Sequence, residues 1–170
     1  MPRPDPRIAL LLEILDQAFD RKAWHGTTLR GALRGLLADD VLARPGPRRH
    51  CIWDLTLHTA YWKYAVRRLL TGARRGRFAR PGSNWPPLPS PVSEAAWEED
   101  VALLAEEHRL LRQAVAALRP SLLDRRPAGS IWTRRELIHG VAAHDLYHAG
   151  QVQLLKRLRQ PGRGKVMADA

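Results

Sequence analysis

Apolar residues recur at steps of three and four along most of the chain, the spacing of amphipathic helices. The pattern predicts a first helix that begins at Asp5, with Pro6 in its first turn, and ends near residues 24–26. A shorter helical stretch follows, with Leu29, Leu33, Leu36 and Leu37 on one face. Leu, Ala and Arg dominate, and alternating β-branched residues are missing, so the sequence predicts no strand.

Three further long helices are expected. One runs from about Cys51 to Leu70 and stops before Gly72, and the next begins at Ser93 and is ended by Pro120. The last begins at Thr133, which forms a capping box with Glu136, and continues to about residue 160. These elements predict an all-α fold: a four-helix bundle with a short extra helix after the first long helix and a long loop, residues 72–92, between the second and third.

Histidines interrupt the apolar stripes of three of the four long helices. The stripes read Leu55-His58-Trp62-Ala65-Leu69, Trp97-Val101-Leu104-His108-Leu111-Val115-Leu118 and Leu137-Val141-His144-His148-Gln151-Leu155-Leu158. A buried imidazole needs a partner for each nitrogen, and most single cases are ordinary core histidines. His144 and His148, one turn apart, point at the same spot, and a metal is the simplest agent that satisfies both. His58 would supply a third ligand, leaving one position open.

Other polar residues near these histidines have weaker interpretations. His108 is either a core histidine or a channel-lining residue. The motif lacks the glutamate of H-E-x-x-H proteases. Asp145 projects about 100° away from His144 on the helix, so it is expected to be solvated or to support a metal ligand without binding the metal. Asp54 could orient His58, but an exposed carboxylate near a helix start is the favoured alternative.

Length and composition narrow the class of protein. The 170 residues predict one domain over residues 1–160, with residues 161–170 as a flexible tail. The single cysteine, Cys51, excludes a disulfide framework or a thiolate metal site. No apolar run is long enough to span a membrane and no signal peptide is recognisable, which predicts a cytoplasmic protein without membrane partners.

The net charge of +11 comes from 24 Arg and 4 Lys against 17 acidic residues. Such a charge raises nucleic acid as a partner. The sequence has no helix-turn-helix, zinc-finger or RNA-recognition pattern, so nucleic acid is the weakest of the functions considered. Arginines of residues 67–80 could steer an anionic small molecule, although a solvated face and loop is the favoured interpretation.

Two segments resemble a known family. The run His144-Asp145-Leu146-Tyr147-His148-Ala149-Gly150-Gln151 resembles the His-x-x-x-His-Arg-Gly-Gln motif of the DinB/YfiT-like family, with Ala149 where Arg is frequent. Residues 52–62, which contain His58, resemble the earlier histidine helix of that family. The resemblance in element order spans about residues 7–159.

The resemblance implies a four-helix bundle with a divalent metal held by His58, His144 and His148. Zinc or nickel is expected, with iron or manganese as alternatives. The resemblance also suggests pocket residues: His25 and Trp85 at the mouth, together with Trp62, His108 and Gln151. A helix-ending turn and a packed loop anchor are the alternatives for the segments around His25 and Trp85.

Three functions therefore stay open. The first is a metal-dependent enzyme, in which the open position activates water or a low-molecular-weight thiol, as in a hydrolase or a thiol transferase. Its partners would be a small-molecule substrate and a thiol cofactor, and relatives suggest a homodimer. The second is a non-catalytic metal-binding or sensing module, and the third is the nucleic-acid binder. No catalytic side chain is identified by the sequence.

Overall fold

The computed structural model describes residues 5–73 and 76–159, and the part of the chain it describes contains helices and no strand. Four helices are long: α1 (Pro6–Phe19), α4 (Ile52–Thr71), α5 (Glu94–Ala116) and α6 (Arg134–Arg159). Three are short: α2 (Leu29–Leu33), α3 (Ala38–Val41) and the 3-10 helix η1 (Pro120–Leu122). The predicted all-α helical bundle is confirmed.

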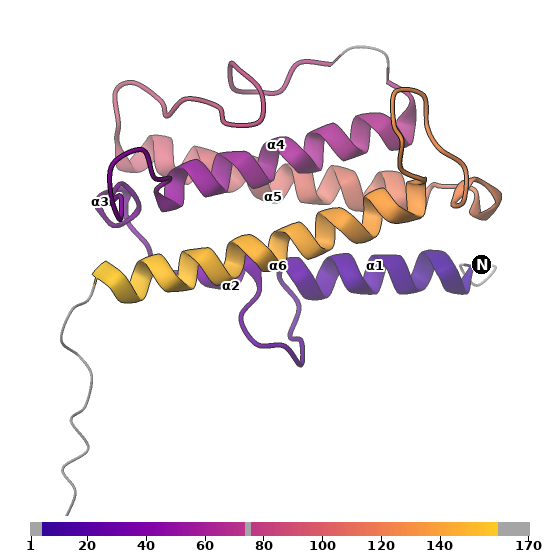
Figure 1. Ribbon diagram of the computed structural model, residues 1–170, viewed down its shortest axis with the longest axis horizontal. Helices are drawn as coiled ribbons and strands as arrows, with labels where there is room; N and C mark the ends of the chain where they lie inside the picture. The colour runs from indigo at the N-terminus through magenta and orange to yellow at the C-terminus, as the bar shows by residue number, and fades with distance from the viewer. Residues whose placement is uncertain (1–4, 74–75, 160–170) are drawn as a thin grey trace, which may run out of the picture.

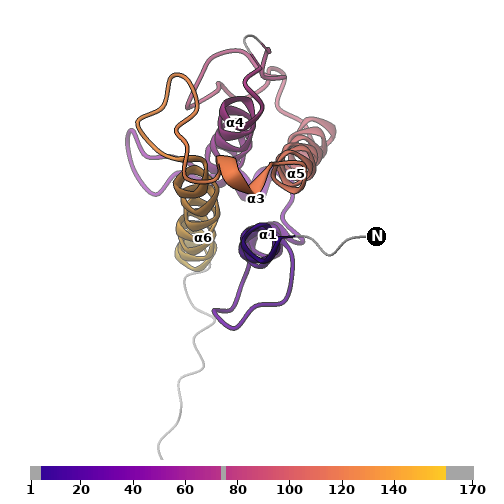
Figure 2. The same cartoon turned by 90° about the vertical axis from the view of Figure 1, so that its right-hand side faces the viewer.

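The four long helices lie side by side around one interior (Figure 1). α4 packs against α5 and α6, and α1 packs against the same two helices. Seen end-on, the four therefore occupy the corners of a square, with α1 diagonal to α4 and α5 diagonal to α6 (Figure 2). This arrangement makes α4 and α6 neighbours, and these are the two helices that carry His58, His144 and His148.

The predicted helix starts are confirmed by hydrogen bonds. Asp5 Oδ1 accepts from Arg7 N at 2.9 Å, and Ser93 Oγ accepts from Ala96 N at 3.2 Å. Thr133 N donates to Glu136 Oε2 at 2.8 Å while Glu136 N donates to Thr133 Oγ1 at 3.3 Å, which is a complete capping box. Short polar side chains at these positions satisfy backbone N–H groups that a helix leaves unpaired.

The end predicted for the first helix is wrong. α1 ends at Phe19, and Gly26, with φ +105°, lies in a turn that pairs with Ala23. Phe19 is the last buried apolar side chain of that stripe, and residues 20–27 are mostly exposed, so packing does not extend the helix further.

The single short helix predicted after α1 is two short helices, α2 and α3. Gly35 separates them, because its φ of +71° is a left-handed conformation that interrupts a right-handed helix. Leu37, expected on the apolar face, is 60% exposed. The connection is fixed on α5 instead, where Trp97 Nε1 donates to the Leu36 carbonyl at 2.9 Å.

Parts of the predicted apolar stripes face outward. Trp62 is 38% exposed and Leu158 is 59% exposed, whereas Lys63 and Asp145 are completely buried. Successive residues of an α-helix point about 100° apart, so Trp62 and Lys63 face different directions, and it is Lys63 that faces the core. On α4 the inner positions are those of Lys63, Val66 and Leu70.

The loop between α4 and α5 is held against both helices by packing and hydrogen bonds. Phe78 is buried in the core, and Arg80 Nε donates to Asp100 Oδ1 at 2.7 Å. The other oxygen of the fully buried Asp100 accepts from Trp53 Nε1 at 2.7 Å. These contacts bring the next part of the loop, including Asn84 and Trp85, over the N-terminal half of α4.

The remaining predictions concern the C-terminal tail, the domain bounds and membrane-spanning helices. The tail over residues 161–170 lies outside the described residues, and the single domain over residues 1–160 stays a prediction. In the described ranges, no helix is long and apolar enough to cross a bilayer.

Candidate metal centre

Three imidazole rings converge between α4 and α6. His144 Nε2 lies 3.1 Å from His58 Nε2 and 3.0 Å from His148 Nε2. One ring nitrogen of each residue lies within 4.8 Å of those of the other two. Three nitrogens bound to one tetrahedral metal at about 2.0–2.1 Å would be roughly 3.3 Å apart, close to the two short separations.

The outer ring nitrogens fix the tautomers. His58 Nδ1 donates to the backbone carbonyl of Asn84 at 2.6 Å, and His148 Nδ1 donates to Gln151 Oε1 at 2.6 Å. Each of these neutral rings carries its proton on Nδ1 and presents a lone pair at Nε2. His144 Nε2 faces both lone pairs and can donate to one at most.

A cation among the three nitrogens satisfies all of them. With Nε2 of His144 directed to that cation, its proton would sit on Nδ1, which is buried and has no hydrogen-bond partner. The donor set therefore fits a divalent transition metal held by three imidazoles.

Burial keeps the three histidines uncharged. It lowers the pKa of His58 to about 4 and, with the neighbouring His148 adding to it, the pKa of His144 to about 3. Burial lowers the pKa of His148 in the same direction. Since metals bind the neutral imidazole, these rings are ready to act as ligands at neutral pH.

The loop before α5 holds the His58 ring from two sides. Asn84 adopts a φ of +59°, directs its carbonyl to His58, and accepts from Trp62 Nε1 at its side-chain Oδ1, 2.9 Å away. Trp85 stacks on His58, with ring centroids 3.8 Å apart and planes 11° apart. His50 stacks on the opposite face of Trp85 at 3.5 Å. Such contacts orient a ligand and fix its tautomer.

A cavity of about 590 Å³ opens beside the histidines, between α4 and the N-terminal half of α6. His58 and the half-buried His144 lie in its wall, together with Trp62, Val66 and Val141. A volume of this size accommodates a small molecule. The position left open by three protein ligands would therefore face a substrate-sized space.

Three of the predicted pocket residues lie at this centre. Trp62 lines the cavity, Trp85 packs on His58, and Gln151 bonds His148.

The other two predicted pocket residues lie elsewhere. His25 lines a separate cavity with Thr27. His108 is buried against α1, stacked on Phe19 at 3.9 Å, with Lys63 Nζ 3.4 Å from its Nδ1. The buried position fits a core histidine, and His108 also lines a cavity with Asp16 and Arg112 that is separate from the one beside the metal ligands.

The first of the two alternatives given for Asp145, a solvated carboxylate, is wrong. Its side chain is 0% exposed and forms an ion pair with the equally buried Lys63. Burial raises the pKa of Asp145, and one of its oxygens, Oδ1, has no hydrogen-bond partner. The pair is buried and joins α4 to α6, and Asp145 follows His144 directly along α6.

Asp54 caps α4 and makes none of its hydrogen bonds to His58. It accepts from Cys51 N at 2.9 Å and from Arg44 Nη2 at 3.2 Å, so the predicted exposed carboxylate is in fact a largely buried ion-pair partner. Cys51 is fully buried, and burial raises the pKa of its thiol, which makes it a poor nucleophile.

Sequence reasoning missed Lys63, the Asn84 carbonyl and His50. Lys63 had a signal: it stands four residues after Thr59 and three before Val66, on the true inner stripe of α4. The Asn84 contact is made by backbone, so no side-chain type could reveal it.

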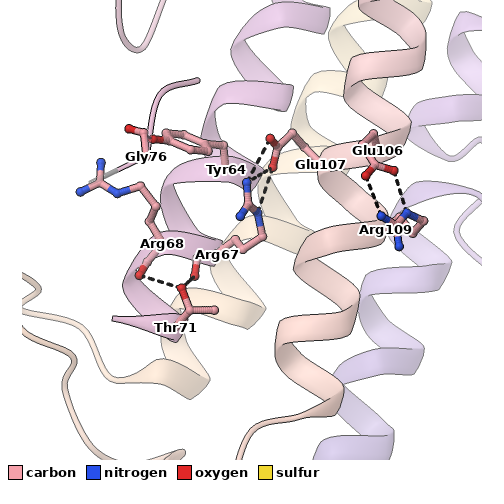
Figure 3. Close-up of polar contacts among 8 residues, drawn as sticks. All are labelled: Tyr64, Arg67, Arg68, Thr71, Gly76, Glu106, Glu107 and Arg109. Atoms are coloured by element: carbon pink, nitrogen blue, oxygen red, sulfur yellow. Dashed lines mark hydrogen bonds and ion pairs between the residues drawn. The ribbon is translucent and has the colours of Figure 1, made fainter. Parts of the chain in front are cut away.

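The described arginines of residues 67–80 do not gather at the histidines, and Arg74 and Arg75 lie outside the described residues. Arg67 forms a two-pronged ion pair with Glu107 across α4 and α5, with Nη2–Oε2 at 2.8 Å (Figure 3). Arg80 is bound to Asp100. Among the described arginines of this segment, none lines the cavity beside the metal ligands, which agrees with the interpretation of a face and loop.

Acid should destabilise the metal-free protein. Histidines titrate near 6.5 when unfolded, whereas burial puts the pKa of His58 at about 4 and that of His144 at about 3. At pH values between the folded and the unfolded pKa, the unfolded chain binds more protons than the folded chain. The free energy of unfolding therefore falls as the pH falls from 7 toward 4.

Urea unfolding at pH 7.5 and pH 5 measures this effect. Replacing His144 with Phe should reduce the pH dependence, and replacing the exposed His25 with Ala should leave it unchanged. A wild-type stability that is equal at both pH values would contradict the neutral, buried state of these rings.

Comparison with known protein families gives one match. The sequence pattern that defines the DinB superfamily matches residues 22–152, a range that contains all three histidines of the centre. Comparison with curated proteins and with solved structures gives no match. The family match and the resemblance of the two histidine segments agree, and the chain belongs to the DinB superfamily.

Proposed function

We propose that the protein is a metal-dependent transferase that conjugates a low-molecular-weight thiol to a small electrophile. The observation that carries this proposal is the convergence of three neutral imidazoles, two of which, His58 and His144, line a cavity of about 590 Å³. His58, His144 and His148 would hold zinc or nickel, with iron or manganese as alternatives. A divalent metal in such a site lowers the pKa of a bound water or thiol and supplies a nucleophile near neutral pH.

The positions of the carboxylates near the metal ligands favour a thiol over water as the nucleophile. A hydrolase needs a base positioned on the attacking water. Glu136 lines the cavity but is bonded to Thr133 in the capping box, and Asp145 is buried in its pair with Lys63. A thiol is more acidic than water and depends less on such a base. A metal-dependent hydrolase is the second candidate, because the same metal would also activate a water bound at the position that three histidine ligands leave open.

The proposed reaction is a substitution. The thiol sulfur forms a bond to the electrophilic carbon as the bond from carbon to the leaving group breaks, and the thiol proton departs with the leaving group. His58 and His148 keep their protons on Nδ1 throughout, bound to Asn84 and Gln151.

A non-catalytic metal-binding module would need neither the cavity nor an open position. Structural metal sites are usually closed by four protein ligands, whereas three histidines converge in the described part of this chain. The hypothesis of nucleic-acid binding is less well supported, because several arginines, including Arg67, Arg80 and Arg112, form ion pairs with carboxylates of the protein itself.

Cobalt(II)-loaded protein tests the thiol directly. We expect glutathione or cysteine to produce a sulfur-to-cobalt charge-transfer band in the near ultraviolet, and zinc-loaded protein to accelerate conjugation of the same thiol to 1-chloro-2,4-dinitrobenzene. Metal-free protein is the control. Metal-dependent hydrolysis of p-nitrophenyl acetate without the band would favour the hydrolase, and bound metal with neither activity would favour the non-catalytic module.

A further inference from the structure

The cavity beside the metal ligands has a mostly apolar wall. Apart from the metal ligands and the polar residues Asn84, Glu136 and His139, its lining comprises Trp62, Val66, Trp132, Leu137, Gly140 and Val141. α4 supplies the first two, α6 the last three, and Trp132 precedes α6. A ligand that enters beside His144 therefore meets hydrocarbon and indole surface.

Gly140 leaves room at the point nearest the metal ligand. It lies one helical turn before His144, on the same face of α6. A Cβ atom built at Gly140 would meet nothing within 4 Å, so the space above it is open. Glycine in the middle of a helix costs about 0.5–1 kcal/mol relative to alanine, yet here no close packing requires it.

Two indole rings remain partly in water at this cavity. Trp62 is 38% exposed and Trp132 is 56% exposed. Aromatic side chains bury large areas when a flat group packs against them. A ligand with a ring-sized apolar part would cover the exposed surfaces of both indole rings. The cavity volume of about 590 Å³ is within the range of small-molecule sites.

The polar groups at the rim argue against a charged or sugar-like occupant. Glu136 is anionic, because its bonds to Thr133 lower the pKa of its carboxyl, and it would repel an anion. Hydroxyl groups placed against Val66, Leu137 and Val141 would lose water without gaining partners.

We infer that this cavity binds the apolar, ring-sized part of a neutral electrophilic substrate while the reacting end lies at His144. This inference rests on the proposed function for the reacting end and on the cavity alone for the apolar part.

Two hydroxamic acids separate the contributions of metal and cavity. Acetohydroxamic and phenylacetohydroxamic acid carry the same metal-binding group, and only the second carries a ring. With zinc-loaded protein, we expect the phenyl compound to bind about 30- to 100-fold more tightly, the effect of burying one aromatic ring. Isothermal titration calorimetry measures both dissociation constants.

Glycine substitutions locate the effect. Gly140→Leu should place a side chain in the part of the cavity next to His144 and reduce the preference to less than about threefold, while acetohydroxamic acid binds as before. Gly150→Leu is the matched control, because Gly150 is also an exposed glycine of α6 with nothing within 4 Å of a built Cβ, and it lies outside this cavity. Leucine is a better helix former than glycine, so both variants should fold.

A binding experiment with metal-free protein distinguishes failure of the proposed metal-dependent function from failure of the cavity inference. The neutral apolar dye N-phenyl-1-naphthylamine should gain fluorescence with metal-free wild type and with Gly150→Leu, and lose that gain with Gly140→Leu. If neither hydroxamic acid binds but the dye behaves as expected, the open metal position fails and the cavity inference stands.

Two results would overturn the inference itself. One is equal binding of both hydroxamic acids together with a dye signal that Gly140→Leu leaves unchanged. The other is dye binding that disappears as the protein concentration rises through a monomer–dimer transition, which would assign the apolar face to a second copy of the chain.

Discussion

Replacing Lys63 with methionine should destabilise the protein by about 3–5 kcal/mol, the usual effect of leaving one member of a buried ion pair without its partner. Lys63 and Asp145 are both 0% exposed, and Lys63 is the side chain that hydrogen-bonds Asp145. In the variant, the Asp145 carboxylate would remain in the core with no cation. Urea unfolding of the metal-free protein measures the change.

The pH dependence of this loss has a definite sign. Burial raises the pKa of Asp145, and removal of Lys63 takes away the cation that opposes this rise. A carboxyl whose pKa is raised by folding loses stability as the pH rises above its unfolded value, near 3.9. The difference in unfolding free energy between wild type and Lys63→Met should therefore be smaller at pH 5 than at pH 8.

Two controls identify the ion pair as the cause. The double variant Lys63→Met, Asp145→Leu should recover most of the lost stability, because an apolar pair of similar volume often replaces a buried ion pair without loss. Lys22→Met, at an exposed position, should change stability by less than about 0.5 kcal/mol. A Lys63→Met protein as stable as Lys22→Met would contradict the buried pair.

The second large effect is expected for His144→Ala, which should abolish tight metal binding. His144 Nε2 is the nitrogen that lies within 3.1 Å of both other ligands, so its removal leaves His58 and His148 without a common centre. Loss of an outer hydrogen-bond partner of a ligand typically weakens metal binding 10- to 100-fold, and loss of a ligand should exceed that. Competition titration with a chromophoric chelator measures the affinity for zinc.

Matched variants separate ligand loss from unfolding. Gln151→Leu removes the partner of His148 Nδ1 and should weaken zinc binding by only about 10- to 100-fold. His25→Ala removes an exposed histidine that lies at another cavity and should bind zinc as the wild type does. Wild-type affinity in a folded His144→Ala protein would show that the three rings are not the ligands.

Local signals in the sequence predicted the helices well. The capping residues Asp5, Ser93 and Thr133 mark helix starts, because their side chains bond backbone groups only a few residues away. Gly72 likewise marks the end of α4 through its left-handed conformation. The end of α1 was missed, because it depends on where burial stops at Phe19 and on no local residue.

The histidines could be placed because periodicity brings them to one face. His144 and His148 are one turn apart on α6, and His58 belongs to the stripe of the helix that packs beside it. The Lys63–Asp145 pair was missed because charged residues are expected at the surface, whereas these two are buried against each other between α4 and α6. The support of His58 by Asn84 and Trp85 depends on the path of a loop, which follows from tertiary contacts such as Arg80 with Asp100.

Metal content of the wild type tests the central claim most directly. The protein should be purified without a histidine tag, offered zinc, freed of excess by gel filtration, and measured by elemental analysis. We expect about one zinc per chain, the stoichiometry of the single three-histidine cluster in the described residues. A wild-type protein that is folded and retains no zinc, and no nickel, iron or manganese when offered these in turn, would contradict the metal centre and the function built on it.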